Sequence, residues 1–372
     1  MAAMGRSPSA RASSESHLNR LAMRRRASIL CVIAVGLGSL APVPATAARK
    51  AEELAPALRR LAARHGLAFG TAVRASALQQ DDAYSDVLGH QYNALTPENE
   101  LKWAVVHPQP DMYDFRAADI IVAFARRHHM VVHGHTLAWY SQNPDWLLRG
   151  HFGRERLIAI LRDHIATVVG RYRGRVSQWD VVNEAVDDGG ALRHNVWLDG
   201  IGPDYIALAF RFAHEADPSA KLFYNDYLIE NPGPKATAVK RLVRDLVASH
   251  VPINGVGFQL HTLPALFSAP DLARKMAEFS RLGLDVAITE HDVWLAPPFD
   301  HAALLAQARV YRASLASCLA APNCHTYVTW GFTDRYSWIP STFPPFGEAL
   351  PFDANLVPKP AAYALRDELA RR

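Results

Sequence analysis

The stretch QWDVVNEAV, residues 178–186, joins the apolar residues of a buried strand to an abrupt polar end. Its apolar side chains suit a strand interior, but Asn183 and Glu184 follow them immediately. A carboxylate at the edge of a core is costly unless it is paired, hydrogen-bonded or used in chemistry. The rest of the sequence must therefore explain why this strand ends on Glu184.

Seven further short apolar runs occur along the chain, and most are rich in β-branched or aromatic residues. They are LAFGTAV (67–73), QYNALTPE (91–98), MVVHGHTLAW (130–139), KLFYNDY (221–227), NGVGFQLH (254–261), DVAITEHDV (285–293) and HTYVTWGFTD (325–334). Segments with helical spacing lie between them, including residues 117–129, 154–172, 236–250 and 271–283. Eight strands that alternate with helices predict an α/β protein, a single (β/α)8 TIM barrel.

Polar residues follow the hydrophobic part in nearly every one of these runs. They are Glu98, His135, Glu184, Asp226, His261, Glu290 and Asp334. In a (β/α)8 barrel the C-terminal ends of the strands form the rim where active sites are assembled. The sequence therefore predicts that Glu184 lies in a catalytic mouth.

The N-terminal residues have the pattern of an export leader. In residues 23–47, three arginines precede an apolar run of about a dozen residues, and small residues follow. That run is shorter than the ~20 residues of a membrane-spanning helix. We predict a cleaved signal peptide at 1–47, by ordinary secretion or the twin-arginine route, and a catalytic domain at 48–372 in the periplasm or outside the cell.

The leader also accounts for the basic charge of the chain. It carries six arginines and one glutamate, so its removal changes the net charge from +4 to −1. The basic composition therefore gives no reason to expect nucleic acid as a partner. Cys318 and Cys324 remain as an even pair in an exported chain, which predicts a disulfide, with two buried thiols as the alternative.

Glu184 and Glu290 end the fourth and seventh predicted strands, which a closed ring brings to opposite sides of one pocket. Paired carboxylates carry out glycoside hydrolysis, one as a neutral acid and the other as an ionised nucleophile. Asp292 shares a strand face with Glu290, so His261 on the adjacent strand could bond to both. Asn183 supplies an amide for a sugar hydroxyl.

Two alternatives for the same region involve other chemistry or none. HGH at 133–135 resembles the His-x-His pair of metal-dependent hydrolases, with His261 and Asp334 as further ligands. We expect no metal, for two reasons. Those hydrolases usually carry the pair on the first strand, whereas here it ends the third. The fourth strand also lacks the Lys that would bridge two metal ions, or a further His. Tryptophans near the rim could be ordinary core residues or could stack on sugars, whose faces carry apolar C–H groups.

Eight motifs in order resemble glycoside hydrolase family 10, the endo-β-1,4-xylanases. They are TPENELKW (96–103), GHTLAWYSQNPDW (134–146), WDVVNEA (179–185), FYNDY (223–227), GVGFQLH (255–261), ITEHD (288–292), TWGFTDRYSW (329–338) and PFDANLVPKPAAY (351–363). The resemblance covers about residues 52–370. It implies a retaining mechanism with Glu184 as acid/base and Glu290 as nucleophile, whose carboxyl groups should lie about 5 to 5.5 Å apart.

The resemblance also implies a set of residues that bind sugar near the cleaved bond. They are Glu98, Asn99, Lys102, His135, Trp139, Asn183, Gln259, His261, Trp330 and Trp338, with Tyr227 beyond the cut. No cofactor is implied. The expected partner is a polysaccharide such as xylan, and we expect a monomer with no stable membrane association after cleavage of the leader.

The chain departs from the family pattern at four positions: His133, Tyr140, Asn254 and His291. Tyr140 and His291 are expected near the pocket, where they could change substrate preference or pH optimum. The Pro-rich segment 341–351 is expected to be a lid over the cleft or a passive surface loop. Two further functions stay open, a hydrolase of another β-linked glycoside or short oligomer, and a barrel that binds sugar without cleaving it.

Overall fold

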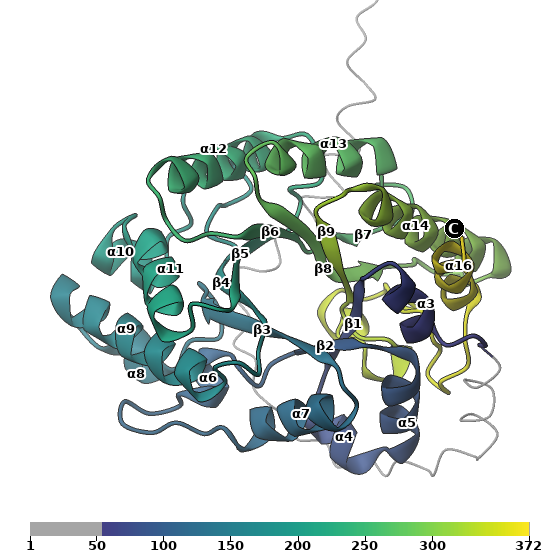
Figure 1. Cartoon of the computed structure of the whole chain (residues 1–372), viewed down its shortest axis with the longest axis horizontal. Coiled ribbons are helices and arrows are strands. Elements are labelled where there is room, and N and C mark those ends of the chain that lie inside the picture. The colour runs from purple at the N-terminus through teal and green to yellow at the C-terminus, as the bar shows by residue number, and fades with distance from the viewer. Residues whose placement is uncertain (1–53, 372) are drawn as a thin grey trace, which may run out of the picture.

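A ring of parallel strands surrounded by helices forms the centre of the molecule (Figure 1). This computed structural model describes residues 54–371, so the predicted leader lies outside the described residues. The strands are β1 (Ala68–Val73), β2 (Ala94–Pro97), β3 (Val131–Ala138), β4 (Gln178–Asn183), β5 (Lys221–Asp226), β6 (Gly255–Phe258), β7 (His261–Thr262), β8 (Asp285–Val293) and β9 (Cys324–Thr329).

The strands close into a barrel. Their order is β6-β5-β4-β3-β2-β1-β9-β8-β7, and a further pairing of β6 with β8 completes the ring. Every pairing between these strands is parallel. The two-residue strand β7 pairs with β8 beyond the end of β6, so the ring itself has eight strands. The predicted (β/α)8 barrel is therefore confirmed.

Helices lie around the ring and connect its strands. They are α3 (Leu58–Arg64), α4 (Ala75–Gln80), α5 (Asp82–Gln91), α6 (Trp103–Val106), α7 (Arg116–Arg127), α8 (Asp145–Arg149), α9 (Arg154–Arg171), α10 (Val196–Ile201), α11 (Tyr205–Ala216), α12 (Pro234–Ala248), α13 (Ala269–Ser280), α14 (His301–Ala320), η2 (Asp334–Tyr336), α15 (Ile339–Thr342) and α16 (Pro360–Leu369). The four segments predicted from helical spacing correspond to α7, α9, α12 and α13.

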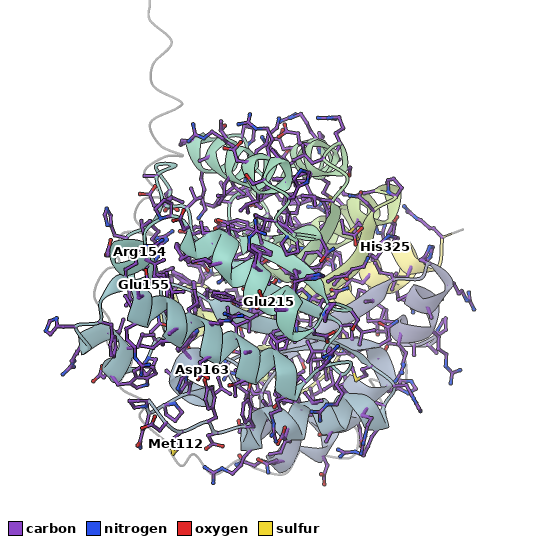
Figure 2. All side chains as sticks on the ribbon, turned by 60° about the vertical axis from the view of Figure 1, so that its left-hand side comes forward. Met112, Arg154, Glu155, Asp163, Glu215 and His325 are labelled. Carbon is purple, nitrogen blue, oxygen red and sulfur yellow. A yellow bond between two sulfur atoms is a disulfide. The ribbon has the colours of Figure 1, made fainter. Side chains whose placement is uncertain are left out.

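Helix α9 shows how the amphipathic pattern positions an outer helix. Leu157, Leu161 and Ile165 are buried on its inner face. Figure 2 shows charged side chains on the outer surface, including Arg154 at the start of α9 and Glu215 on α11. The apolar stripes of such helices pack on the strands, and the rim of the strands is left for polar residues.

The two cysteines form the predicted disulfide. Cys318 near the end of α14 and Cys324 at the start of β9 are joined by an S–S bond of 2.05 Å. Both residues are buried. The bond joins the last turn of a helix to the N-terminal end of a strand, so it lies at the end of the barrel opposite the rim.

Helices α3 and α16 pack together, close to the first and last described residues. The ring of His65, just after α3, lies with Nε2 2.9 Å from the carbonyl oxygen of Leu369 at the end of α16. Among residues 54–371, no helix combines the length and the apolar character needed to cross a membrane.

Candidate active site

Glu184 and Glu290 both lie at the C-terminal ends of strands. Glu184 directly follows β4, and Glu290 belongs to β8. Each is only 5% exposed. The backbone of Glu184 has a φ of 54°, in the left-handed region that few residues other than glycine adopt. Its N–H donates to the carbonyl of Asn225 at 2.9 Å, which fixes this unusual end of the strand.

Amide side chains connect the two glutamates. Nδ2 of Asn225 donates to Oε1 of Glu290 at 2.7 Å, and it lies 2.9 Å from Oδ1 of Asn183. Nε2 of Gln259 lies 3.1 Å from the same Asn183 oxygen and donates to Oε1 of Glu184 at 3.1 Å. A continuous path of short contacts therefore links Glu184 to Glu290 across the mouth of the barrel.

Asn225 is a member of this network that the sequence reasoning did not select. It lies opposite Asn183 in the register of β4 with β5. Its Oδ1 accepts a 2.6 Å hydrogen bond from Thr289, which precedes Glu290. The available signal was an asparagine in the C-terminal half of a predicted strand, but its partner depends on the register between strands.

His261 lies between Glu290 and Asp292. Its Nδ1 is 2.8 Å from Oδ1 of Asp292, and its Nε2 is 3.2 Å from Oε2 of Glu290. Burial alone would lower the pKa of His261, but Asp292 and Glu290 raise it to about 10. The imidazole is therefore a cation at neutral pH, and it lies directly against Glu290.

Two further histidines, His133 and His135, are buried inside the barrel. His133 Nε2 and His135 Nδ1 contact opposite oxygens of Asp180, at 2.8 and 2.9 Å. Burial raises the pKa of Asp180, but the two histidines outweigh this and lower it to about 2. His135 Nδ1 is also 3.7 Å from Glu290 Oε1. Asp180 was not predicted as a site residue. The available signal was an acidic residue within the apolar fourth strand, directly after Trp179.

The structure does not bring together the four residues considered as metal ligands, His133, His135, His261 and Asp334. Asp334 accepts bonds from Lys359 Nζ at 2.6 Å and from the N–H of Leu350 at 2.9 Å. Among residues 54–371, the one group of three side chains with suitable geometry is His135, Asp180 and Glu290. It contains neither His261 nor Asp334, and its histidine and aspartate are already hydrogen-bonded to each other.

A cavity of about 310 Å³ opens above the two glutamates. It brings together ten of the sugar-binding residues implied by the family resemblance and both predicted catalytic residues. Its lining is Glu98, Asn99, Lys102, His135, Trp139, Tyr140, Ser141, Gln142, Asn183, Glu184, Gln259, His261, Glu290, Trp330 and Trp338. Tyr140, Ser141 and Gln142 complete the wall in addition to the predicted set. Asp292 lies directly behind His261.

The cavity combines indole rings with charged side chains. Lys102 Nζ lies 5.0 Å from the ring centroid of Trp139 and 6.0 Å from that of Trp330. Burial lowers the pKa of Lys102, although Glu98 and Glu290 act in the opposite direction. Nζ also donates to Oδ1 of Asn99 at 3.0 Å. This arrangement offers apolar faces and hydrogen-bond donors side by side, as a sugar requires.

Tyr227 lies beside the cavity lining, next to the acid/base candidate. Its hydroxyl donates to Asp188 Oδ1 at 2.7 Å and accepts from Arg193 Nη2 at 2.8 Å. Arg193 Nε donates to the Glu184 carbonyl at 3.2 Å, and its guanidinium lies 4.6 Å from the ring centroid of Tyr140. Arg193 is a further residue of this region that the sequence reasoning did not select.

The four departures from the family pattern have different locations. Tyr140 lines the cavity, as expected. His291 does not, because it is fully buried on the outer face of β8, between Tyr311 and Tyr327. His133 contacts Asp180 inside the barrel. Asn254 accepts from the N–H of Leu222 at the opposite end of the strands.

Segment 341–351 lies behind the cavity wall and contributes none of its lining residues. Phe343 stacks on Trp294, with ring centroids 4.6 Å apart, and contacts Trp338 edge-on at 5.4 Å. Ile339, Ala349 and Leu350 are the other buried members of this small cluster. The segment therefore supports Trp338 from behind and does not cover the cavity as a lid.

The fold and the site together define a barrel of the glycosidase class, with two buried glutamates at the C-terminal rim of a tryptophan-lined cavity. The family model described as glycosyl hydrolase family 10 matches residues 57–368. The chain therefore belongs to glycosyl hydrolase family 10.

Individual relatives agree with this membership. Endo-1,4-beta-xylanase B of Thermotoga neapolitana is 42% identical over 293 residues, which cover 78% of this chain and 84% of that protein. The crystal structure of native xylanase 10B from Thermotoga maritima has a TM-score of 0.82 and 42% identity, covering 84% of this chain and 98% of that one. Xylanase 10B of Thermotoga petrophila, solved in complex with xylobiose, has a TM-score of 0.82 and 41% identity, covering 84% and 97%.

Proposed function

We propose that the chain is a retaining endo-1,4-β-xylanase that hydrolyses internal xylosidic bonds of xylan. The observation that carries the proposal is the path of amide contacts between Glu184 and Glu290 below a tryptophan-lined cavity. The names of the relatives, including the one solved with xylobiose, support xylan as the substrate. We also propose a monomer as the active form.

The surroundings of the two glutamates support different roles. Glu290 accepts from Asn225 at 2.7 Å and lies 3.2 Å from Nε2 of His261, so its two oxygens are held in a fixed orientation, which suits a nucleophile. The carbonyl of Glu184 accepts from Arg193 Nε at 3.2 Å, and Arg193 also contacts Tyr227 and the ring of Tyr140. We place this group on the side of the leaving sugar. Glu184 is therefore assigned as the acid/base.

The reaction proceeds in two steps, formation and then hydrolysis of a covalent glycosyl-enzyme ester. Glu290 forms an ester bond to the anomeric carbon while the glycosidic C–O bond breaks, and the proton of Glu184 moves to the departing oxygen. Glu184 then takes a proton from water, whose oxygen attacks the same carbon and releases Glu290. Two inversions at this carbon retain its configuration, and no cofactor takes part in either step.

Replacement of either glutamate tests the assignment. Glu290→Gln is expected to lose at least about 10⁴-fold in kcat on xylan and on aryl xylosides, because the nucleophile is gone. Glu184→Gln should lose a similar factor on xylan but far less in the first step on an aryl xyloside with a good leaving group, which needs no protonation. Equal losses on both substrates would contradict the separate roles. NMR of the first product should show the β-anomer.

A product profile separates the proposal from its alternatives. Xylan should give short oligomers, whereas cellulose and mixed-linkage glucan should remain intact. Cleavage of another glycan at a higher kcat/KM would indicate a hydrolase of a different β-linked glycoside. Binding of xylo-oligomers without any hydrolysis would indicate a sugar-binding barrel.

We further propose that residues 1–47 direct export and are removed, which leaves 48–372 as the catalytic domain. The basic and apolar pattern at residues 23–47 supports this division. The N-terminal sequence of protein recovered from the periplasm or medium should begin close to residue 48. Recovery of the intact chain in the cytosol would contradict it.

A further inference from the structure

The strand that carries Gln259 and His261 is broken at the height of the active site. Strand β6 ends at Phe258, and pairing with β8 resumes at β7, where His261 lies opposite Asp292. Between them Leu260 has a φ of 61°, which is strained for a branched side chain. Such a conformation persists only where its surroundings hold it in place.

This break positions partners for both glutamates. Gln259 precedes Leu260 and donates to Glu184 at 3.1 Å. His261 follows it and lies 3.2 Å from Glu290. A rotation of the peptide groups at Leu260 would therefore move one contact of each catalytic carboxylate at the same time.

A side chain on the strand of Glu290 holds the carbonyl of Leu260. Nδ1 of His291 lies 2.8 Å from this oxygen, and because a carbonyl only accepts, Nδ1 must carry the proton. His291 is fully buried, with ring centroids 4.7 Å from Tyr311 and 5.9 Å from Tyr327. Burial lowers its pKa to about 4, so the ring is neutral at neutral pH.

Packing alone does not explain a histidine here. Nε2 of His291 has no hydrogen-bond partner among residues 54–371. A buried polar atom without a partner destabilises the folded state, and an apolar residue of similar size would avoid this cost. The bond from Nδ1 to Leu260 is the contact that an apolar residue could not replace.

We propose that His291 is a positioning residue, whose Nδ1–H holds the Leu260 carbonyl and so keeps Gln259 and His261 against Glu184 and Glu290. The proposal deepens the proposed function, because it rests on the roles of the two glutamates. It assigns a task to a side chain that is neither in the cavity nor in contact with substrate.

Two substitutions at this position separate positioning from packing. His291→Asn places an amide donor near the place of Nδ1 but leaves space in the pocket, whereas His291→Leu fills the space and has no donor. Positioning predicts that the Asn variant stays within about threefold of wild-type kcat, and that the Leu variant loses tenfold or more in kcat with less than threefold change in KM. The limbs of the pH profile of kcat/KM should move in the Leu variant only.

A packing role predicts the opposite order, with Leu active and Asn impaired, and that order would overturn the proposal. Equal activity and equal pH profiles in both variants would overturn it as well. Tyr327→Phe is the matched control, since it alters a wall of the same pocket without touching the Leu260 carbonyl. It should change thermal stability and leave the pH profile in place.

A measurement on the unmodified protein covers the case in which a variant fails to fold. Two-dimensional ¹H–¹⁵N NMR of the histidine rings should show His291 neutral, with its proton on Nδ1, from about pH 6 to pH 9. A proton on Nε2 would overturn the proposal whatever the variants do. Failure of wild-type protein to cleave xylan would instead count against the proposed substrate, and the variants could then be compared on whichever aryl glycoside is cleaved.

Discussion

Asp292 connects two parts of the cavity wall, His261 and Trp338. It accepts hydrogen bonds from Trp294 at 2.6 Å and from Trp338 at 2.9 Å, and it lies 2.8 Å from Nδ1 of His261. Through these contacts the carboxylate of Asp292 holds two side chains in place: His261, which contacts Glu290, and Trp338, which forms part of the cavity wall. Such a shared acceptor holds Glu290, the proposed nucleophile, and the indole of Trp338 in a fixed arrangement.

The raised pKa of His261 predicts a pH-dependent stability. Its pKa is about 10 in the folded protein, against about 6.5 in an unfolded chain. The folded state therefore binds this proton more tightly, and the stabilisation is complete below about pH 6.5 and is lost as the pH rises through 10. Urea denaturation near pH 6 should show a free energy of unfolding that is larger for wild type than for His261→Gln. The expected difference is on the order of a few kcal/mol, as the difference between the folded and unfolded pKa of His261 implies.

The comparison with His261→Gln isolates this effect from the titration of lysines and tyrosines, which both proteins share. The difference between the two proteins should shrink steadily between pH 7 and pH 10.5. A difference that stays constant or grows over this range would contradict a raised pKa at His261.

At the scale of the elements, the strands were predictable because their apolar runs and polar ends follow directly from burial on a parallel sheet. Glu184 and Glu290 could be found for the same reason. Asn225 and Arg193 could not, since their role depends on which neighbours the register and the loops bring near. The break at Leu260 was also invisible, because no glycine marks its positive φ.

The segment after β9 depends on a buried lysine. Lys359 Nζ contacts Asp334 Oδ2 at 2.6 Å, and it donates to the carbonyl of Glu348 at 2.7 Å. These bonds tie Asp334, which precedes Trp338, to Glu348 in the segment 341–351 behind it. Burial raises the pKa of Asp334 to about 7 even with Lys359 present, so the aspartate depends on this partner for its charge.

Lys359→Met should therefore loosen the segment behind Trp338. Loss of one partner from a buried ion pair typically costs about 3–5 kcal/mol, which denaturation would measure. We expect KM for xylo-oligomers to rise severalfold with a smaller change in kcat, because Trp338 belongs to the cavity wall that would bind sugar and supplies no reacting group. The double variant Lys359→Met with Asp334→Leu should recover part of the lost stability, and no recovery would contradict a direct pairing.

At the scale of the whole molecule, the candidate active site and the disulfide lie at opposite ends of the barrel. The site occupies the C-terminal rim, whereas Cys324 begins its strand at the other end. A barrel separates such tasks because the rim loops carry the chemistry and the opposite face contributes to stability.

Replacement of both cysteines by serine should therefore reduce stability and spare activity. A disulfide that closes a loop of this length is expected to contribute about 2 kcal/mol through the unfolded chain. Thermal melting should show a lower Tm for Cys318→Ser/Cys324→Ser, with kcat on xylan within twofold of wild type below that temperature. A large fall in kcat in the folded variant would mean that the two ends of the barrel are coupled.

The contact of His65 with Leu369 gives the chain a useful geometry for engineering. His65 lies just before the N-terminal end of β1, so this contact is at the end of the barrel opposite the cavity. A short peptide could join α3 and α16 there, and new ends could be opened in a surface loop. Such a circular permutant, or a fusion or immobilising tag placed at this junction, should leave polymer access to the cleft unobstructed.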